Sequence, residues 1–170
     1  MDPEKMLKGR KILIVDDEKD ILDSLIELLD MCRIDTATTF EEGKRLLENE
    51  TYEVAILDIM GVKGFELLEK CVELGFPAVM FTAHALTPEA IEQSMKLGAV
   101  FLLPKDRMMD LQEFLEEVVV GGGKPFWNRF FDRLDFYFEN RFGANWKDVK
   151  ALVKVLEKDI SKNSLPKSEE

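Results

Sequence analysis

The first 120 residues alternate between short apolar runs and segments with the periodicity of amphipathic helices. The runs span residues 11–15, 34–38, 54–57, 78–81 and 100–103, and all but the second are apolar almost throughout. Between them, apolar side chains recur every three or four positions. Continuous apolar runs suit strands that are covered on both faces, as in a parallel sheet. The pattern predicts an α/β fold, a doubly wound five-stranded parallel sheet with a helix after each strand.

Composition limits the class of protein further. The 170 residues are 46% hydrophobic, which is enough for a substantial core. No apolar run approaches the roughly 20 residues of a membrane span, and the first residues lack the apolar centre of a secretory signal. We therefore expect a cytoplasmic protein without membrane contact. Cys32 and Cys71 are not in CxxC spacing and are expected to be free, buried thiols.

The charge is unevenly distributed along the chain. Residues 1–120 hold 13 basic and 26 acidic residues, whereas residues 121–170 hold 10 and 8. The overall charge of −11 argues against a nucleic-acid partner, because affinity for phosphate backbones comes from clustered Lys and Arg. A glycine triplet followed by Lys124 and Pro125 marks the change. We predict a domain over 8–120 and a linker over 121–125, since the GK pair lacks the spacing of a phosphate-binding loop.

The segment after the linker is rich in aromatic residues. Nine of the sixteen Phe, Tyr and Trp residues lie between Phe126 and Trp146. Helical spacing predicts one helix through 126–142 and a second through 149–160, which together form a helical hairpin extension over 126–162, followed by a polar tail over 163–170. Two helices cannot bury this much aromatic surface alone. The partner could be the preceding domain, a second copy of the chain in a homodimer through 126–160, or another protein.

Polar residues close four of the predicted strands. Asp16 and Asp17 follow the first run, Asp58 the third, Thr82 the fourth, and Lys105 comes just past the fifth. Each is ordinary alone, but parallel strands bring their carboxyl ends to one edge of the sheet. Carboxylates gathered there repel one another, so a cation is needed to keep them ionised together. Oxygen ligands without His or Cys favour Mg²⁺.

Four motifs stand in the same order and spacing as those of a known family. They are ILIVDDEKD at 12–20, VAILDIM at 54–60, VMFTAHA at 79–85 and LLPKD at 102–106. On these motifs, residues 8–120 resemble the receiver domain of two-component response regulators. The resemblance implies a flavodoxin-like (βα)5 fold, a place in phosphorelay signal transduction, and a phosphoryl donor that is a histidine kinase or a phosphotransfer protein.

The resemblance also implies roles for the acidic residues. Asp58 would be the phosphoacceptor. Asp17 would bind Mg²⁺ directly, Asp16 would assist through water, and Asp58 and the backbone carbonyl of Met60 would complete the protein ligands. A carboxylate is already ionised at neutral pH, and aspartyl phosphates are known covalent intermediates, so the chemistry agrees with this assignment.

Three further residues would contact the phosphoryl group. The resemblance assigns Thr82, Lys105 and the backbone N–H of Ala83 to its oxygens, which suits a transition state that spreads charge over three equatorial oxygens. Attraction of Thr82 to the phosphoryl group would then shift the following loop and change the preference for a downstream protein partner.

The chain departs from the family pattern at several positions. The loop after Asp58 is shorter, with its first glycine at Gly61. Around Lys105, a proline precedes the lysine and Asp106 follows it, whereas the family usually has a proline after the lysine. The usual position of the aromatic switch residue holds Leu102, and the neighbouring Phe101 should point to the opposite face of its strand.

His84 is the one histidine of the chain and lies two positions after Thr82. It reads either as a surface residue or, with Met60, as a residue that tunes water access to the phosphoryl group and hence the lifetime of the phosphorylated form. Phe101 and Leu102 are the other candidates for tuning the switch.

Three hypotheses for the function remain open. The first is a response regulator that accepts a phosphoryl group on Asp58 and signals through protein contacts of its C-terminal helices, without an enzymatic or DNA-binding output domain. The second is a receiver-like scaffold that takes no phosphoryl group. The third is a transcription regulator with a reduced DNA-binding tail.

Overall fold

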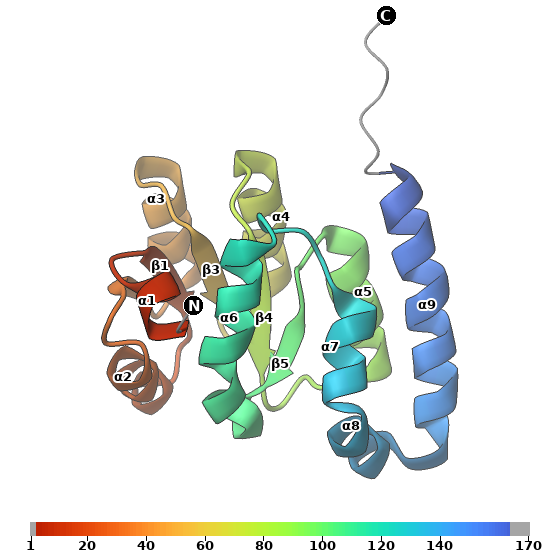
Figure 1. Ribbon diagram of the computed structural model, residues 1–170. Coiled ribbons are helices and arrows are strands. Elements are labelled where there is room, and N and C mark those ends of the chain that lie inside the picture. Colours follow the sequence, from red (N-terminus) through yellow and green to blue (C-terminus); the bar gives the residue numbers. More distant parts are fainter. Residues whose placement is uncertain (1–2, 164–170) are drawn as a thin grey trace, which may run out of the picture.

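The computed structural model describes residues 3–163 and contains the predicted parallel sheet (Figure 1). The strand order is β2–β1–β3–β4–β5, with every neighbouring pair parallel. The bounds are β1 (Lys11–Val15), β2 (Arg33–Ala37), β3 (Val54–Leu57), β4 (Ala78–Thr82) and β5 (Leu102–Pro104). Strand β5 is shorter than expected and begins two residues later, while β4 extends by one residue to Thr82.

Helices cover both faces of the sheet, which explains why the central strands are apolar throughout (Figure 1). The helices α3 (Phe40–Asn49), α4 (Gly64–Leu74) and α5 (Pro88–Leu97) pack side by side on one face. The other face carries α2 (Lys19–Leu28), α6 (Leu111–Val120) and a short N-terminal helix, α1 (Pro3–Leu7), that lies against α6. The sequence analysis did not predict α1. The fold is the doubly wound α/β class that the apolar runs predicted.

Helix boundaries follow local capping chemistry. The Thr39 hydroxyl accepts a hydrogen bond from the Glu42 N–H at the start of α3, and Thr87 does the same with Ala90 at the start of α5. Pro88 occupies the first position of α5 and Gly98 ends it in the left-handed region. The two threonine caps fix where the loops at the carboxyl edge of the sheet end, and Gly98 fixes where the loop that leads back to β5 begins.

The expectation of one helix through 126–142 was wrong. Two helices, α7 (Trp127–Arg133) and α8 (Asp135–Phe142), meet at Leu134, whose φ of −110° and ψ of 18° interrupt the helix. The chain turns at Leu134 because α8 does not continue in line with α7 but packs its buried Phe138 against Phe131 and Trp146. A one-turn helix, η2 (Gly143–Asn145), leads into α9 (Trp146–Asn163), and the predicted tail beyond residue 163 lies outside the described residues.

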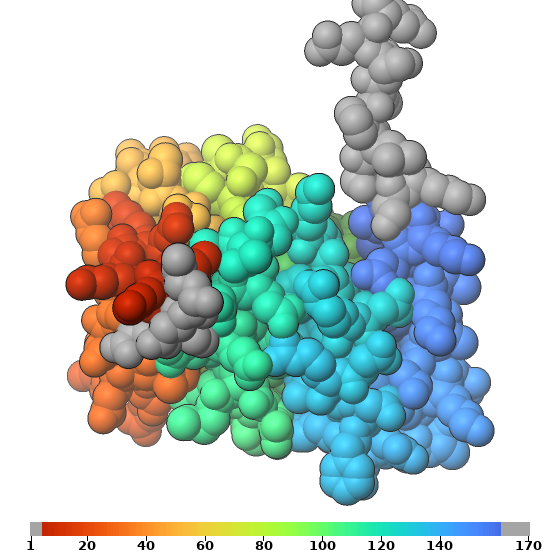
Figure 2. Space-filling model, viewed as in Figure 1, coloured from red at the N-terminus to blue at the C-terminus, as the bar shows by residue number. Residues whose placement is uncertain are grey.

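The C-terminal helices pack on the domain that precedes them. The Trp127 indole N–H donates to the Ala99 carbonyl at 3.0 Å, just before β5. The ring of Phe130 stacks on Phe101 with centroids 5.1 Å apart. Helix α7 therefore lies beside β5, while α9 lies against both α5 and α7 (Figure 1). Figure 2 shows these helices continuing the surface of the sheet domain without a gap on that face. Three packing partners were considered for the aromatic residues of the extension. In the structure, these residues pack against the preceding domain.

Two further expectations concern cysteines and membranes. Cys32 and Cys71 are free thiols, the first half-buried and the second buried. Burial raises the pKa of Cys32 to about 11 and that of Cys71 to about 12, so both are protonated and unreactive at neutral pH. Within residues 3–163, no helix has the length and apolarity needed to cross a bilayer.

Candidate functional site

Lys105 joins the predicted site residues at the carboxyl ends of the strands. It begins the short 3-10 helix η1 (Lys105–Asp110) directly after β5. Its ammonium lies 2.8 Å from the Asp16 carboxylate, 2.9 Å from Asp58 and 3.1 Å from Glu18. Residues from the ends of β1, β3 and β5 therefore meet at one point, as their places in the sequence predicted.

The acidic cluster is larger than expected. Asp16, Asp17, Glu18 and Asp58 each offer one carboxylate oxygen, and these four oxygens lie within 4.8 Å of one another. Asp16 and Asp58 are buried, whereas Asp17 and Glu18 are exposed, so the cluster opens to solvent on one side. The sequence analysis missed Glu18 as a site residue. Its signal was the uninterrupted DDE run directly after the first strand.

The electrostatics of the cluster favour a bound cation. Burial raises the pKa of Asp16, although hydrogen bonds to Lys105 and to the Glu18 N–H oppose this shift. Burial lowers the pKa of Lys105, but hydrogen bonds to Asp16 and Asp58 outweigh it and keep that pKa above its usual value. Lys105 therefore stays charged, yet one ammonium faces four carboxylates. A hard divalent cation with oxygen ligands fits this excess of negative charge.

The loop after Asp58 runs directly beside the cluster. A Cβ on Gly61 would lie 2.2 Å from a carboxylate oxygen of Asp17, so this glycine lets the backbone approach the acid. Met60, the predicted carbonyl ligand, directly precedes this glycine, and its side chain is exposed.

Gly64 fixes the position of Asp58 itself. A Cβ at this first residue of α4 would lie 1.8 Å from the Asp58 carbonyl oxygen. Replacing Gly64 with Ala should lower the free energy of unfolding by about 3 kcal/mol, because the backbone that carries Asp58 must move. The measurement is chemical denaturation. Gly43→Ala is the matched control, since its Cβ would meet side chains and no backbone atom, Val15 at 3.1 Å and Leu67 at 3.5 Å, and an equal loss there would contradict this prediction.

Thr82 ends β4 with an unpaired hydroxyl. The residue is buried, and its Oγ1 has no hydrogen-bond partner among the described residues. A buried polar atom without a partner is unusual and points to a ligand or a second conformation. Ala83 and His84 follow and are both exposed residues. His84 therefore lies on the surface beside the site.

The aromatic candidate for the switch lies elsewhere. The Phe101 ring packs against Phe114, Phe126 and Phe130, between the sheet and the C-terminal helices. Leu102, the next residue, is also fully buried. Phe101 thus contributes to the packing of the extension. Successive side chains of a strand point to opposite faces, so Phe101 was expected to point away from the face that Leu102 occupies.

The residues around Lys105 accommodate the departure from the family pattern. Pro104 ends β5, and the Lys105 ammonium still reaches Asp58 at 2.9 Å. Asp106, which stands where the family usually has proline, accepts hydrogen bonds from the Tyr137 hydroxyl at 2.8 and 3.0 Å. The reordered pair therefore leaves the lysine in place and adds a contact to α8.

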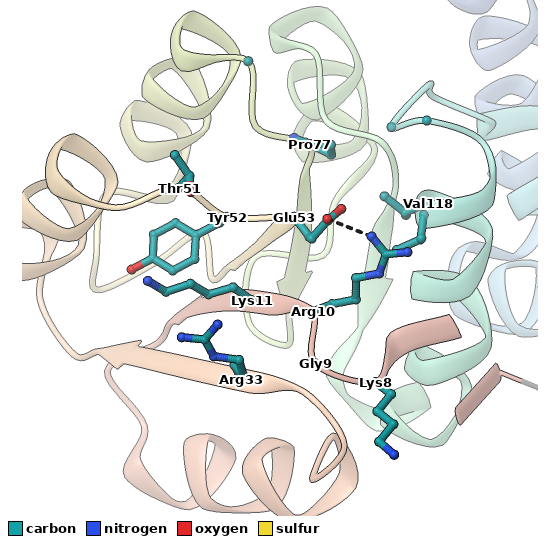
Figure 3. A pocket seen from close by; sticks show the side chains of 14 residues that line it. Lys8, Gly9, Arg10, Lys11, Arg33, Thr51, Tyr52, Glu53, Pro77 and Val118 are labelled. Atoms are coloured by element: carbon teal, nitrogen blue, oxygen red, sulfur yellow. Dashed lines mark hydrogen bonds and ion pairs between the residues drawn. The ribbon is translucent and has the colours of Figure 1, made fainter. Parts of the chain in front are cut away.

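A separate pocket of about 790 Å³ lies at the opposite end of the sheet (Figure 3). Four cationic side chains line it, and two of them are paired, Arg10 with Glu53 at 2.9 Å and Lys11 with Glu50 at 2.8 Å. None of the predicted site residues lines this pocket. The candidate site is therefore the acidic cluster at the carboxyl edge.

The sheet domain is similar to known proteins. The model of the response regulator receiver domain matches residues 12–118. The two-component response regulator ARR10 of Arabidopsis thaliana is 31% identical over 119 residues, which is 65% of this chain and 21% of that protein. The chain thus spans about a fifth of the length of that relative.

Solved structures agree. A CheY-like response regulator receiver domain protein from Methanospirillum hungatei JF-1 superposes with a TM-score of 0.57 and 33% identity, covering 65% of this chain and 96% of that one. The BeF3-activated DrrB receiver domain gives a TM-score of 0.53 and 26% identity, over 64% and 98%. With the motifs, the sheet order and the family match in agreement over residues 12–118, the chain belongs to the response regulator receiver domain family.

Proposed function

We propose that Asp58 accepts a phosphoryl group from a histidine kinase or a phosphotransfer protein, and that the chain signals through protein contacts that depend on this modification. The observation that carries the proposal is the position of Asp58. Its carboxylate lies 2.9 Å from a buried ammonium and within 4.8 Å of three further carboxylates that could hold a cation. This arrangement supports a role for Asp58 as a nucleophile whose neighbours would stabilise a phosphoryl oxygen.

The chemistry is a direct displacement at phosphorus. An oxygen of the Asp58 carboxylate attacks, a P–O bond forms, and the P–N bond to the donor histidine breaks with its electron pair staying on the imidazole. Lys105 and the Thr82 hydroxyl would each take a phosphoryl oxygen. The unpaired hydroxyl of Thr82 and the exposure of Ala83 support these roles.

Magnesium fits the same site. Asp16, Asp17, Asp58 and the Met60 carbonyl would hold the ion, which when bound would neutralise charge on the transferring phosphoryl group. The excess of carboxylates over ammonium groups and the close approach of the Gly61 backbone support this assignment. Lys105 would balance the rest of the negative charge.

The output is proposed to be a protein contact made by the C-terminal helices. These helices pack on the sheet domain, and α8 contacts residues next to the site. Because the chain matches about a fifth of the length of ARR10, the output of that longer protein is not carried over.

Intact mass spectrometry tests the proposal. Incubation with phosphoramidate or acetyl phosphate and Mg²⁺ should add the mass of one phosphoryl group to the chain. Asp58→Asn should remove this increase because the amide is a poor nucleophile. Asp23→Asn, the same change on the exposed face of α2, should leave it unchanged. A chain that gains no mass with either donor would favour the scaffold hypothesis.

A further inference from the structure

Helix α8 is hydrogen-bonded to two segments that border the candidate site. The Tyr137 hydroxyl donates to the Asp106 carboxylate at 2.8 Å, and the Arg141 guanidinium donates to the Leu86 carbonyl at 3.4 Å. Asp106 directly follows Lys105, and Leu86 lies in the loop that begins after Thr82. One helix of the extension therefore contacts the neighbours of both residues proposed to bind the phosphoryl group.

We propose that α8 senses the phosphorylation state of Asp58 through these two hydrogen bonds. When Asp58 carries a phosphoryl group, Thr82 moves toward it and the Lys105 ammonium shifts from the Asp58 carboxylate to a phosphoryl oxygen. The segments that carry Leu86 and Asp106 then move relative to α8, which weakens its contacts with them. The exposed face of α8 is then free to move. The inference rests on the proposed function of Asp58. It identifies α8 as the element whose contacts change when Asp58 is phosphorylated.

The direction of the change follows from the order of the strands. Asp58 follows β3, Thr82 ends β4, and Lys105 follows β5. The C-terminal helices lie on the outer side of β5 (Figure 1). A shift of Thr82 toward Asp58 is therefore a shift toward the centre of the sheet and away from the extension, and it would stretch the bond to Leu86. The Lys105 ammonium already lies 2.9 Å from Asp58 and must make room for the phosphoryl group, so the bond from α8 to the next residue, Asp106, would be disturbed as well.

The buried face of α8 prevents the helix from following. Phe138 is fully buried and lies against Phe131 and Trp146, with ring centroids 4.9 Å away in both cases. Helix α7 is fixed in turn by the ring of Phe130 on Phe101 and by the bond of Trp127 to Ala99. The anchoring contacts are buried aromatic packing, whereas the two sensing contacts are hydrogen bonds near the surface. Phosphorylation should loosen α8 locally without detaching the extension.

The surface that would change is distinctive. Phe136 on α8 is 78% exposed, the largest exposure of any aromatic side chain in the part of the chain with described side chains. A pocket of about 470 Å³ lies between α8 and η1, and both partners of the Tyr137–Asp106 bond line it. Loss of that bond alters the wall of the pocket. Phosphorylation of Asp58 would thereby change the shape of a surface outside the site itself.

Hydrogen–deuterium exchange tests the inference, with beryllofluoride and Mg²⁺ as the probe. Binding of the probe should raise amide exchange in residues 135–142 by about fivefold or more, the lower end of ordinary coupling between sites. Tyr137→Phe should exchange faster without the probe and respond less to it. Because coupling is reciprocal, Tyr137→Phe should also bind beryllofluoride about fivefold more tightly. Arg141→Gln should behave in the same way through the second bond.

A matched control is available at the other end of the sheet. The Tyr52 hydroxyl donates to Asp35 at 2.7 Å, so Tyr52→Phe removes the same kind of bond far from α8. This variant should exchange and bind the probe like the unmodified chain. Fluorine NMR shows whether the probe binds. Binding without any change in α8 would overturn the inference and leave the proposed function intact, whereas absence of binding would contradict both.

Discussion

Lys105→Met is expected to lower the rate of Asp58 phosphorylation by about 100-fold, the usual loss when one group that stabilises transition-state charge is removed. Methionine is similar in length to lysine but brings no charge to the phosphoryl oxygen. The side chain of Lys105 is only 5% exposed, so water cannot replace the ammonium. The measurement is the rate of mass increase with phosphoramidate at saturating Mg²⁺.

The same substitution should make stability depend on Mg²⁺. Without Lys105, Asp16 and Asp58 keep their buried charges and lose their nearest counter-charge, which costs about 3 kcal/mol or more. Binding of Mg²⁺ to the folded chain would restore part of this loss. Lys96→Met is the control, because its ion pair with Glu92 is exposed and should matter little. A Lys105→Met variant with an unchanged rate would contradict the assigned role.

Phe130→Ala is expected to lower the free energy of unfolding by about 3–5 kcal/mol. The ring is fully buried, with centroids 4.7 Å from Phe114, 5.1 Å from Phe101 and 5.4 Å from Phe131. Truncation leaves a cavity where α6, β5 and α7 meet. Urea denaturation followed by tryptophan fluorescence measures the loss, since Trp127 lies in the same cluster.

Phe136→Ala is the matched control for this prediction. It removes an aromatic ring from the adjacent helix, but this ring is 78% exposed, so the change should stay within about 0.5 kcal/mol. Equal losses in the two variants would show that the extension does not pack on the domain as described. A large loss at Phe130 alone supports the account of α7 as an integral layer of the fold.

The sheet and most of its site could be predicted because both depend on local pattern. Buried parallel strands must be apolar throughout, so the apolar runs in the sequence identify the strands. The residues that end these strands must meet at one edge of the sheet. Asp16, Asp58 and Lys105 were located in this way, and in the structure the Lys105 ammonium lies 2.8 Å from the Asp16 carboxylate and 2.9 Å from that of Asp58. The second strand was the weakest run because it lies at the edge of the sheet.

The extension could be predicted only in outline because its shape depends on distant contacts. The aromatic spacing indicated helices, but nothing local marks Leu134 as the point where α7 ends. That break follows from the packing of Phe138 on Trp146, which no short window of sequence contains. The contact between Tyr137 and Asp106 joins residues 31 positions apart and was invisible for the same reason.

Localisation of the phosphoryl group is the most direct test of the central claim. Borohydride reduces an aspartyl phosphate to homoserine and leaves free carboxylates unchanged, so peptide mapping after phosphorylation and reduction identifies the acceptor. The account predicts homoserine at position 58 and aspartate at positions 16 and 17. Homoserine at 16 or 17 with an unmodified Asp58, or no homoserine in a chain treated with donor and Mg²⁺, would contradict it.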